Sequence, residues 1–88
     1  MSWRRAPNTL WREFEFRDYD DAKVFADYIA ERVEDHHRHP DLKLTRNRVR
    51  IVVENLHNAG ITLAEERLAA KVDAVLAELY RAARERGE

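Results

Sequence analysis

Three of the four histidines of this sequence lie close together, at His36, His37 and His39. Pro40 follows them, and acidic residues and an arginine surround them. An imidazole changes its protonation state near neutral pH, so this cluster could serve proton transfer, ligand binding or metal coordination. The polar C-terminus of a helix has a similar composition, because cationic side chains interact favourably with the negative end of the helix dipole. The residues alone leave these interpretations open.

Metal coordination has the weakest support among these interpretations. His36 and His39 have a spacing that metal ligands can use, and Asp35 or Asp41 would lie nearby. A closed zinc site usually has four protein ligands, and no fourth ligand is obvious in this segment. The chain also has no cysteine, which excludes disulfides and cysteine-ligated metals. We therefore predict no metal site.

A strand and then a helix lead into the histidine cluster. Hydrophobic and polar residues alternate from Leu10 to Phe16, which predicts a strand. Asp18 is a suitable helix N-cap, and a hydrophobic stripe with helical spacing follows it. The stripe contains Ala22, Phe25, Ala26, Ile29 and Val33. Because Pro40 disfavours helical backbone in the residue before it, we expect this helix to end near His37.

Two short strands and a second helix are predicted after the cluster. Alternating residues indicate strands at 42–44 and 49–53, with a turn at Arg46-Asn47 between them. The sequence from Thr62 to Glu65 is a capping box that begins the last helix. We expect the charged end, residues 81–88, to fray. This order predicts an α+β fold, in which two long helices pack on one face of an antiparallel sheet.

Length and composition limit the class of protein. The 88 residues suit a single domain, which we expect to span residues 1–88, with an N-terminal arm or short edge strand at Met1 to Thr9 as the fourth strand. Sixteen Lys and Arg balance seventeen Asp and Glu, so a nucleic-acid or membrane partner is not expected. No hydrophobic run has the length of a membrane span, and no signal peptide follows Met1. We therefore expect a cytoplasmic protein.

Several short blocks follow one another in the order and spacing of a known family. The blocks are Leu10–Tyr19, Arg38-His39-Pro40 with Glu34 four residues before it, Asn47-Arg48-Val49, Ala59-Gly60-Ile61-Thr62 and Leu68-Ala69. Together they make the chain, from Trp3 to about Leu79, resemble the pterin-4a-carbinolamine dehydratases, also known as dimerization cofactors of a homeodomain transcription factor. The resemblance implies a reaction that removes the 4a-hydroxyl of a pterin as water, without a cofactor.

The family's catalytic residues are only partly present in this sequence. The resemblance implies that three histidines and an acidic residue serve the pterin pocket. The first histidine position is Arg38, whose guanidinium keeps its proton, whereas the second is the retained His39. The third histidine position falls on Leu56, and the acidic position falls on Glu65. Glu34 is kept.

Two other histidines could compensate for the missing ones. His57 follows Leu56, and a β-bulge could turn it into the pocket. His37 could swing inward if the first helix unwinds early. The candidate catalytic residues are His39, Glu34 and Glu65 of a relic site, with His37 and His57 as rescues. The candidate binding residues are Arg38, Pro40 and His57.

These substitutions favour a pseudoenzyme that binds proteins. The family includes a partner of a transcription factor, and divergent small members encoded with carboxysome and Rubisco genes that are thought to assist Rubisco assembly. We therefore expect a non-catalytic assembly factor, with Rubisco as the suggested protein partner. The alternative is an active 4a-hydroxytetrahydrobiopterin dehydratase in pterin recycling, with a pterin as its ligand.

We also expect a homodimer or a tetramer, because family members pair through sheet edges and last helices. Two hydrophobic stripes are predicted on the last helix, whereas one would cover a small sheet. The stripes are Leu68, Val72, Val75 and Leu79, and Ala69, Leu76, Tyr80 and Ala83. Val49–Val53 would offer an open sheet edge to a second copy. Alternatively, the arm from Ser2 to Thr9 covers that edge, and the second stripe widens the core.

Overall fold

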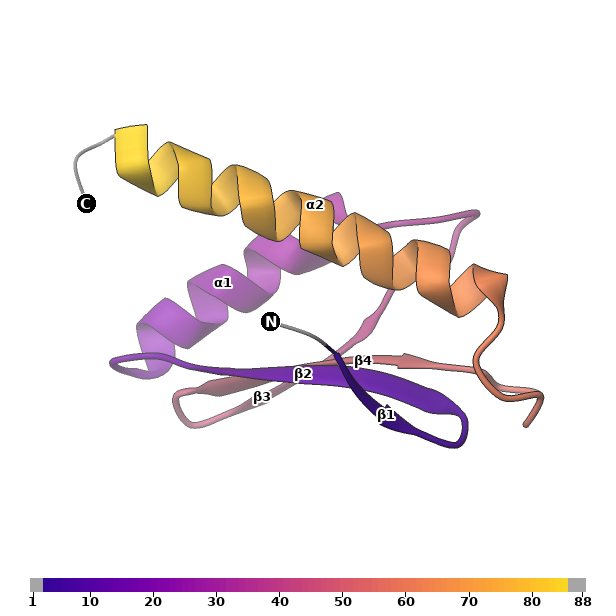
Figure 1. Cartoon of the computed structure of the whole chain (residues 1–88). Helices are drawn as coiled ribbons and strands as arrows, with labels where there is room; N and C mark the ends of the chain where they lie inside the picture. The colour runs from indigo at the N-terminus through magenta and orange to yellow at the C-terminus, as the bar shows by residue number, and fades with distance from the viewer. Residues whose placement is uncertain (1–2, 86–88) are drawn as a thin grey trace.

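The structure, a computed structural model, describes the backbone of residues 3–85 and the side chains of residues 3–81 (Figure 1). Its elements are β1 (Arg4–Ala6), β2 (Thr9–Glu15), α1 (Tyr19–Arg32), β3 (Asp41–Thr45), β4 (Arg48–Glu54) and α2 (Leu63–Glu85). The strands form one antiparallel four-stranded sheet in the order β1-β2-β4-β3. Both helices lie on the same face of this sheet (Figure 1). The predicted α+β architecture is therefore confirmed.

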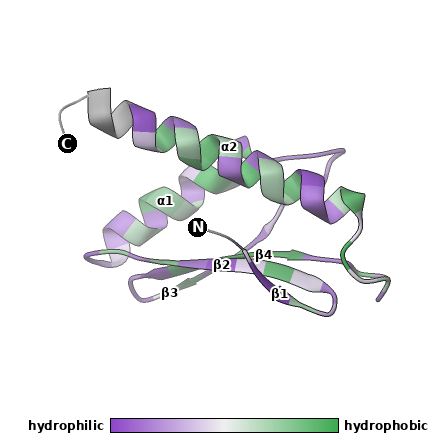
Figure 2. Cartoon of the chain, in the orientation of Figure 1, coloured by the Kyte–Doolittle hydropathy of each residue, from purple (hydrophilic) through white to green (hydrophobic). Residues whose placement is uncertain are grey.

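The hydrophobic core lies between the helices and the sheet. Alternate residues of β4 point into the core. The helices contribute residues at helical spacing, and Figure 2 shows hydrophobic segments on the strands and on the helices. The fully buried large side chains are Leu10, Ile29, Val33, Val49, Ile51, Val53, Leu68 and Val72. This core fixes the positions of the helix ends and loops from which the candidate site is built.

α1 begins as predicted but ends earlier than predicted. The Asp18 carboxylate accepts a hydrogen bond from the backbone N–H of Asp21 at 2.9 Å, which caps the helix. The helix ends at Arg32, whereas we expected it to continue to about His37. Val33 takes an extended conformation, and the tight turn that is closed by two backbone hydrogen bonds between Asp35 and Arg38 follows it. A tight turn, and not a helical turn, therefore carries His36 and His37, and His39 follows it.

The position of β4 corrects the prediction about the sheet edge. β4 pairs with β2 on one side and with β3 on the other, so Val49–Val53 lies inside the sheet. The edges are β1 and β3. β1 is the short edge strand predicted for the N-terminal arm. The sequence pattern identified a strand correctly but carried no information about its neighbours.

α2 corrects the prediction of a second, exposed stripe. Ala69 and Leu76 of that stripe are buried, and Tyr80 is 69% exposed. The helix contacts both β4 and α1, so it needs hydrophobic residues on two sides. Ala83 lies outside the described side chains. The helix also continues through Glu85, although we predicted fraying from residue 81 onward.

Arg12 is the polar residue on the core face of β2, and it has a partner there. Its guanidinium lies 3.0 Å from the Asp73 carboxylate of α2, and Trp3 donates a hydrogen bond to the same carboxylate at 3.0 Å. The Arg12 guanidinium also lies 4.9 Å from the ring of Phe14, where a cation–π contact is favourable. This cluster attaches the N-terminal segment and β2 to α2.

Candidate functional site at the start of α2

Glu65, in the first turn of α2, is the centre of a polar cluster. Its side chain is only 3% exposed. One carboxylate oxygen accepts hydrogen bonds from the backbone N–H and the hydroxyl of Thr62, at 2.7 and 2.6 Å. The same oxygen accepts a bond from the Asn55 amide at 3.3 Å. The bond to the Thr62 backbone is the one that the predicted capping box requires.

The other oxygen of Glu65 pairs with Arg38. The Arg38 Nη1 atom lies 2.7 Å from it, and Nη2 donates to the backbone carbonyl of Glu54. Arg38 thus connects the segment after α1 with the end of β4 and the start of α2. Arg38 and Glu65 are both candidate site residues predicted from the sequence, and the fold brings them into direct contact.

The surroundings of Glu65 keep its carboxylate charged. Burial alone would raise the pKa, because it disfavours the charged form. The hydrogen bonds from Thr62, Arg38 and Asn55 outweigh burial and lower the pKa of Glu65 from 4.5 to about 2. At neutral pH this carboxylate therefore has no proton to donate, and it is a poor base because its lone pairs are already occupied.

Asp35 and Arg38 hold the turn that contains His36 and His37. Their backbone groups form two mutual hydrogen bonds, each 2.9 Å long. The carboxylate of Asp35 lies 3.2 Å from Arg67 and 3.2 Å from Lys71, both on α2. Burial opposes the charge on Asp35, but hydrogen bonds from Lys71 and Arg67 outweigh it and lower its pKa. The turn is therefore fixed against α2.

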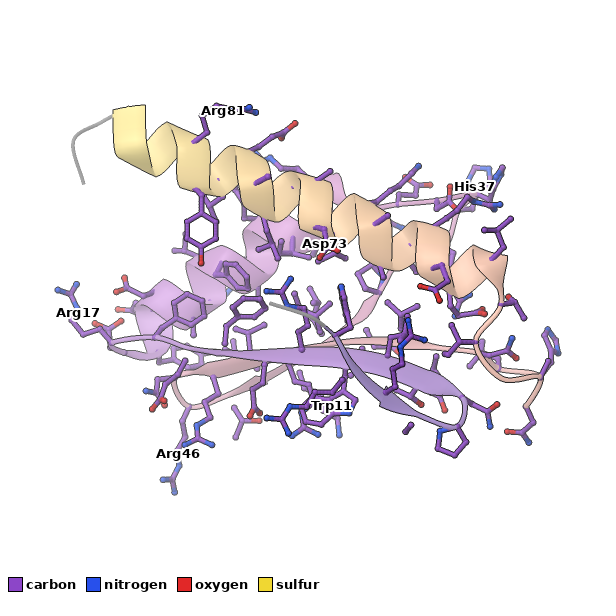
Figure 3. The ribbon with its side chains drawn as sticks, viewed as in Figure 1. Trp11, Arg17, His37, Arg46, Asp73 and Arg81 are labelled. Atoms are coloured by element: carbon purple, nitrogen blue, oxygen red, sulfur yellow. The ribbon has the colours of Figure 1, made fainter. Side chains whose placement is uncertain are left out.

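The histidines do not converge on Glu65 in this conformation. The side chains of His36 and His37 are 79% and 98% exposed. His37 lies 3.5 Å from the Glu34 carboxylate and points outward from the fold (Figure 3). His39 lies at the solvent-facing side of the turn, where its Nδ1 is 3.1 Å from the Val33 carbonyl. His36 and His37 have φ values of 52° and 65°, which the tight turn imposes.

The third histidine position of the resemblance also faces solvent. Leu56 is 78% exposed, and the neighbouring His57 has an exposed side chain. The backbone N–H of His57 donates to the side-chain oxygen of Asn55 at 2.8 Å. Pro40, the remaining candidate binding residue, is buried.

Asn55 is a residue of this cluster that the sequence reasoning missed. It is only 7% exposed. Its side-chain oxygen accepts the N–H groups of His57 and Ala59, and its amide nitrogen donates to Glu65. Asn8 strengthens the same loop by accepting the Gly60 N–H at 2.7 Å. An asparagine directly after a strand was the available signal, because this residue often bonds to nearby backbone groups.

Within residues 3–85, no three histidine, cysteine or acidic residues come together in a way that would hold a metal ion. None of the helices described has both the length and the hydrophobicity to cross a membrane.

Comparison with known proteins places this cluster in context. Residues 1–75 match the family described as Pterin 4 alpha carbinolamine dehydratase. A protein of Thermomicrobium roseum is 34% identical over 70 residues, which cover 80% of this chain and 75% of that protein. A protein of Acidobacterium capsulatum is 32% identical over 75 residues, which cover 85% and 82%. Both carry the name "Putative pterin-4-alpha-carbinolamine dehydratase".

Two solved structures resemble this fold. A transcriptional coactivator/pterin dehydratase from Brucella melitensis superposes with a TM-score of 0.64 at 25% identity, covering 84% of this chain and 81% of that one. A pterin dehydratase-like protein, identified as a RuBisCO assembly factor in the alpha-carboxysome, superposes with a TM-score of 0.62 at 29% identity. That match covers 85% of this chain and 89% of the other.

The buried Glu65 carboxylate predicts a characteristic response to acid. Its pKa is lowered in the folded protein, so its contribution to stability is present above about pH 4.5 and is lost as the pH falls toward 2. We expect Glu65→Gln to lower the free energy of unfolding by about 2 kcal/mol at pH 7, and to flatten its decline below pH 4.5. Urea denaturation at several pH values measures both effects. Glu66→Gln, at an exposed neighbour, is the control, and an equal effect there would contradict the prediction.

Proposed function

This chain belongs to the pterin-4a-carbinolamine dehydratase family, and we propose that it is a non-catalytic member that works as a protein-binding assembly factor, with Rubisco as its partner. The ion pair between Arg38 and Glu65 is the observation that carries the proposal. It occupies two positions that correspond to catalytic residues in the family pattern. A tightly paired arginine and carboxylate contribute structure, but neither exchanges a proton readily at neutral pH.

The chemistry of dehydration explains why these substitutions matter. A proton must reach the departing hydroxyl, and another must leave the pterin ring, so the reaction depends on groups that titrate near pH 7. Arg38 keeps its proton at any working pH, and Leu56 has none to exchange. The Glu65 pKa of about 2 makes this carboxylate a poor substitute for a missing imidazole.

Rubisco is proposed as the partner because this chain is similar to a solved structure of a RuBisCO assembly factor. The solved pterin dehydratase-like protein that is a RuBisCO assembly factor matches 85% of this chain. Binding a partner protein does not require proton transfer. The loop at Asn55 and the turn at Asp35 are held by hydrogen bonds, and a preorganised surface lowers the entropic cost of binding.

An active dehydratase is the second candidate function. The names of the Thermomicrobium and Acidobacterium relatives favour it, and His39 and Glu34 are retained. With Nδ1 of His39 at the Val33 carbonyl, Nε2 would be the nitrogen left for proton transfer. A pterin would then be the ligand of the pocket.

We also propose that the protein forms a homodimer through the C-terminal half of α2. An apolar groove of about 200 Å³ lies beside Tyr80, which is 69% exposed. The groove is lined by Phe14, Phe16, Phe25, Leu76, Leu79 and Tyr80. A second copy would cover this hydrophobic surface, and two-fold dimers are the commonest soluble oligomers. Two such dimers could then form the tetramer.

Dehydratase activity separates the two candidate functions. We expect turnover of 4a-hydroxytetrahydrobiopterin to lie at least about 10³-fold below that of an active family member assayed in parallel, because each general acid or base contributes roughly 10²–10⁴-fold. Arg38→His alone should restore little activity, since Leu56 still offers no proton. A stopped-flow assay measures both, with circular dichroism to verify folding. Turnover at the level of the active member would refute the proposal.

Rubisco assembly tests the partner directly. Large subunits produced together with this protein should give more assembled Rubisco on a native gel than large subunits produced alone. His39→Ala, which would disable a dehydratase, should leave the gain unchanged, because assembly needs no proton transfer. An unchanged yield of assembled Rubisco, with the protein soluble and folded, would remove Rubisco as the partner.

The mass in solution tests the dimer. We expect light scattering at micromolar concentration to give a dimer for the natural protein and a monomer for Tyr80→Glu, because the charge would be buried without a partner. Val24→Glu is the matched control, since Val24 is also 69% exposed but lies on α1. Leu76 is unsuitable for this test because it is part of the core. A natural protein with a monomeric mass would contradict the dimer.

A further inference from the structure

Some of the positively charged side chains of this protein form ion pairs with carboxylates, and others do not. Most lysines and arginines with described side chains form ion pairs, for example at Arg5, Lys23 and Arg67. Three cations of the β3–β4 hairpin have no carboxylate partner among the described residues, and we call them the hairpin cations. They are Lys43, Arg46 and Arg48.

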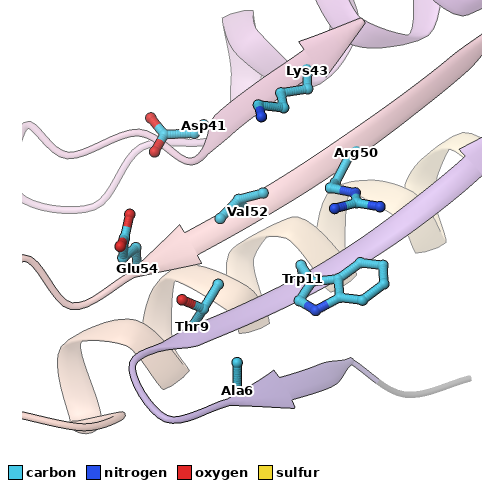
Figure 4. Close-up of a pocket in the computed structure, with 8 residues that line it drawn as sticks. All are labelled: Ala6, Thr9, Trp11, Asp41, Lys43, Arg50, Val52 and Glu54. Atoms are coloured by element: carbon cyan, nitrogen blue, oxygen red, sulfur yellow. The ribbon is translucent and has the colours of Figure 1, made fainter. Parts of the chain in front are cut away.

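The sheet register places these charges close together. Lys43 lies directly opposite Arg50, and Thr45 lies opposite Arg48. Figure 4 shows Lys43 and Arg50 on adjacent strands, on the sheet face away from the helices. Cations directly opposite each other in a sheet destabilise it. Arg50 is offset by Glu13 at 3.4 Å and by the ring of Trp11 at 4.3 Å. Arg48 lies opposite Glu15 of β2, but within the described residues none of the hairpin cations has a carboxylate at ion-pair distance.

The hairpin holds these cations on a rigid support. Asn47 in the turn donates to the Phe16 carbonyl at 2.7 Å, and its own carbonyl accepts the Phe16 N–H at 2.8 Å. Arg46, with a φ of 56°, points away from the body of the protein (Figure 3). A hollow of about 370 Å³ lies at the turn between Thr45 and Arg48. Another of about 260 Å³ is lined by Lys43, Arg48 and Arg50, with Glu13 at its side.

From these observations we propose that the turn end of the β3–β4 hairpin is a docking site for an acidic segment of a partner protein. The proposal rests on the protein-binding function, for which it names the surface and the chemistry of the partner. Arginine guanidinium groups bind carboxylates through paired hydrogen bonds, and lysine adds a mobile positive charge. Carboxylates of the partner would supply the close ion pairs that the hairpin cations do not form within the described residues.

The surrounding charges favour a short acidic segment over a nucleic acid. Glu13 and Glu15 of β2 lie next to the hairpin on the same sheet face, and Asp41 and Glu54 lie toward its other end. A nucleic acid laid along the sheet would meet these carboxylates, and its phosphates would be repelled. The positive surface is therefore confined to the turn end and matches a few carboxylates of a peptide.

Binding of a labelled acidic peptide tests the docking site. Fluorescence anisotropy with a fluorescein-labelled peptide of ten glutamates should detect binding at about 20 mM salt, and binding should weaken as salt screens the charges. The variant Lys43→Glu/Arg46→Glu/Arg48→Glu should lose affinity about tenfold or more. The variant Arg46→Glu/Arg48→Glu should lose most of this affinity, and it keeps Lys43, which protects the open edge of β3.

A charge-matched control separates local docking from general attraction. The variant Lys23→Glu/Arg32→Glu/Arg81→Glu changes the net charge equally on the helical layer, and it should lose less than about threefold in affinity. An equal loss in both triple variants would overturn the proposal, and so would absence of peptide binding to the natural protein. Tighter binding of a labelled oligomer of ten thymidines would also overturn it, in favour of a nucleic acid.

The peptide-binding result is independent of the tests of the proposed function. The dehydratase assay involves Arg38 and Leu56, and the dimer assay involves Tyr80, none of which belongs to the hairpin. If the peptide fails to bind while the natural protein assembles Rubisco without turnover, the docking site is wrong and the proposed function stands.

Discussion

The buried carboxylate of Glu65 is the constraint on which this structure depends most. A charge that is 3% exposed must be compensated, and it takes hydrogen bonds from three separate parts of the chain. Thr62 lies at the start of α2, Asn55 lies in the loop after β4, and Arg38 lies in the turn after α1. One carboxylate thus joins the loop and the turn to the start of α2.

This compensation also limits the chemistry of the site. The hydrogen bonds that make the buried charge acceptable lower its pKa to about 2, so they remove it from proton transfer at neutral pH. Arg38 is used in the same way, since one nitrogen pairs with Glu65 and the other binds the Glu54 carbonyl. In a dehydratase these positions would need to exchange protons. Here they hold the fold together, which is the physical basis for proposing a binding protein.

The sequence by itself determined the elements of the fold and their layers. Period-two alternation in β4 and helical spacing in α1 follow directly from which side chains face the core, so they could be predicted from residue types. The N-cap at Asp18 and the capping box at Thr62 could also be predicted, because each joins residues only three positions apart. The family could also be predicted, because its short motifs keep their order along the chain.

The tertiary structure alone decided which elements are neighbours and where the polar groups meet. β4 lies inside the sheet because β2 pairs with it across a long stretch of sequence, and no local pattern reports such a partner. α1 ends at Arg32 because Val33 is extended and leads into the turn closed by Asp35 and Arg38, and the contact of α2 with both α1 and β4 buries Leu76. The ion pair of Arg38 and Glu65 joins residues that are distant in sequence. Residue types can show that each charge needs a partner, but only the packed fold determines which partner it finds.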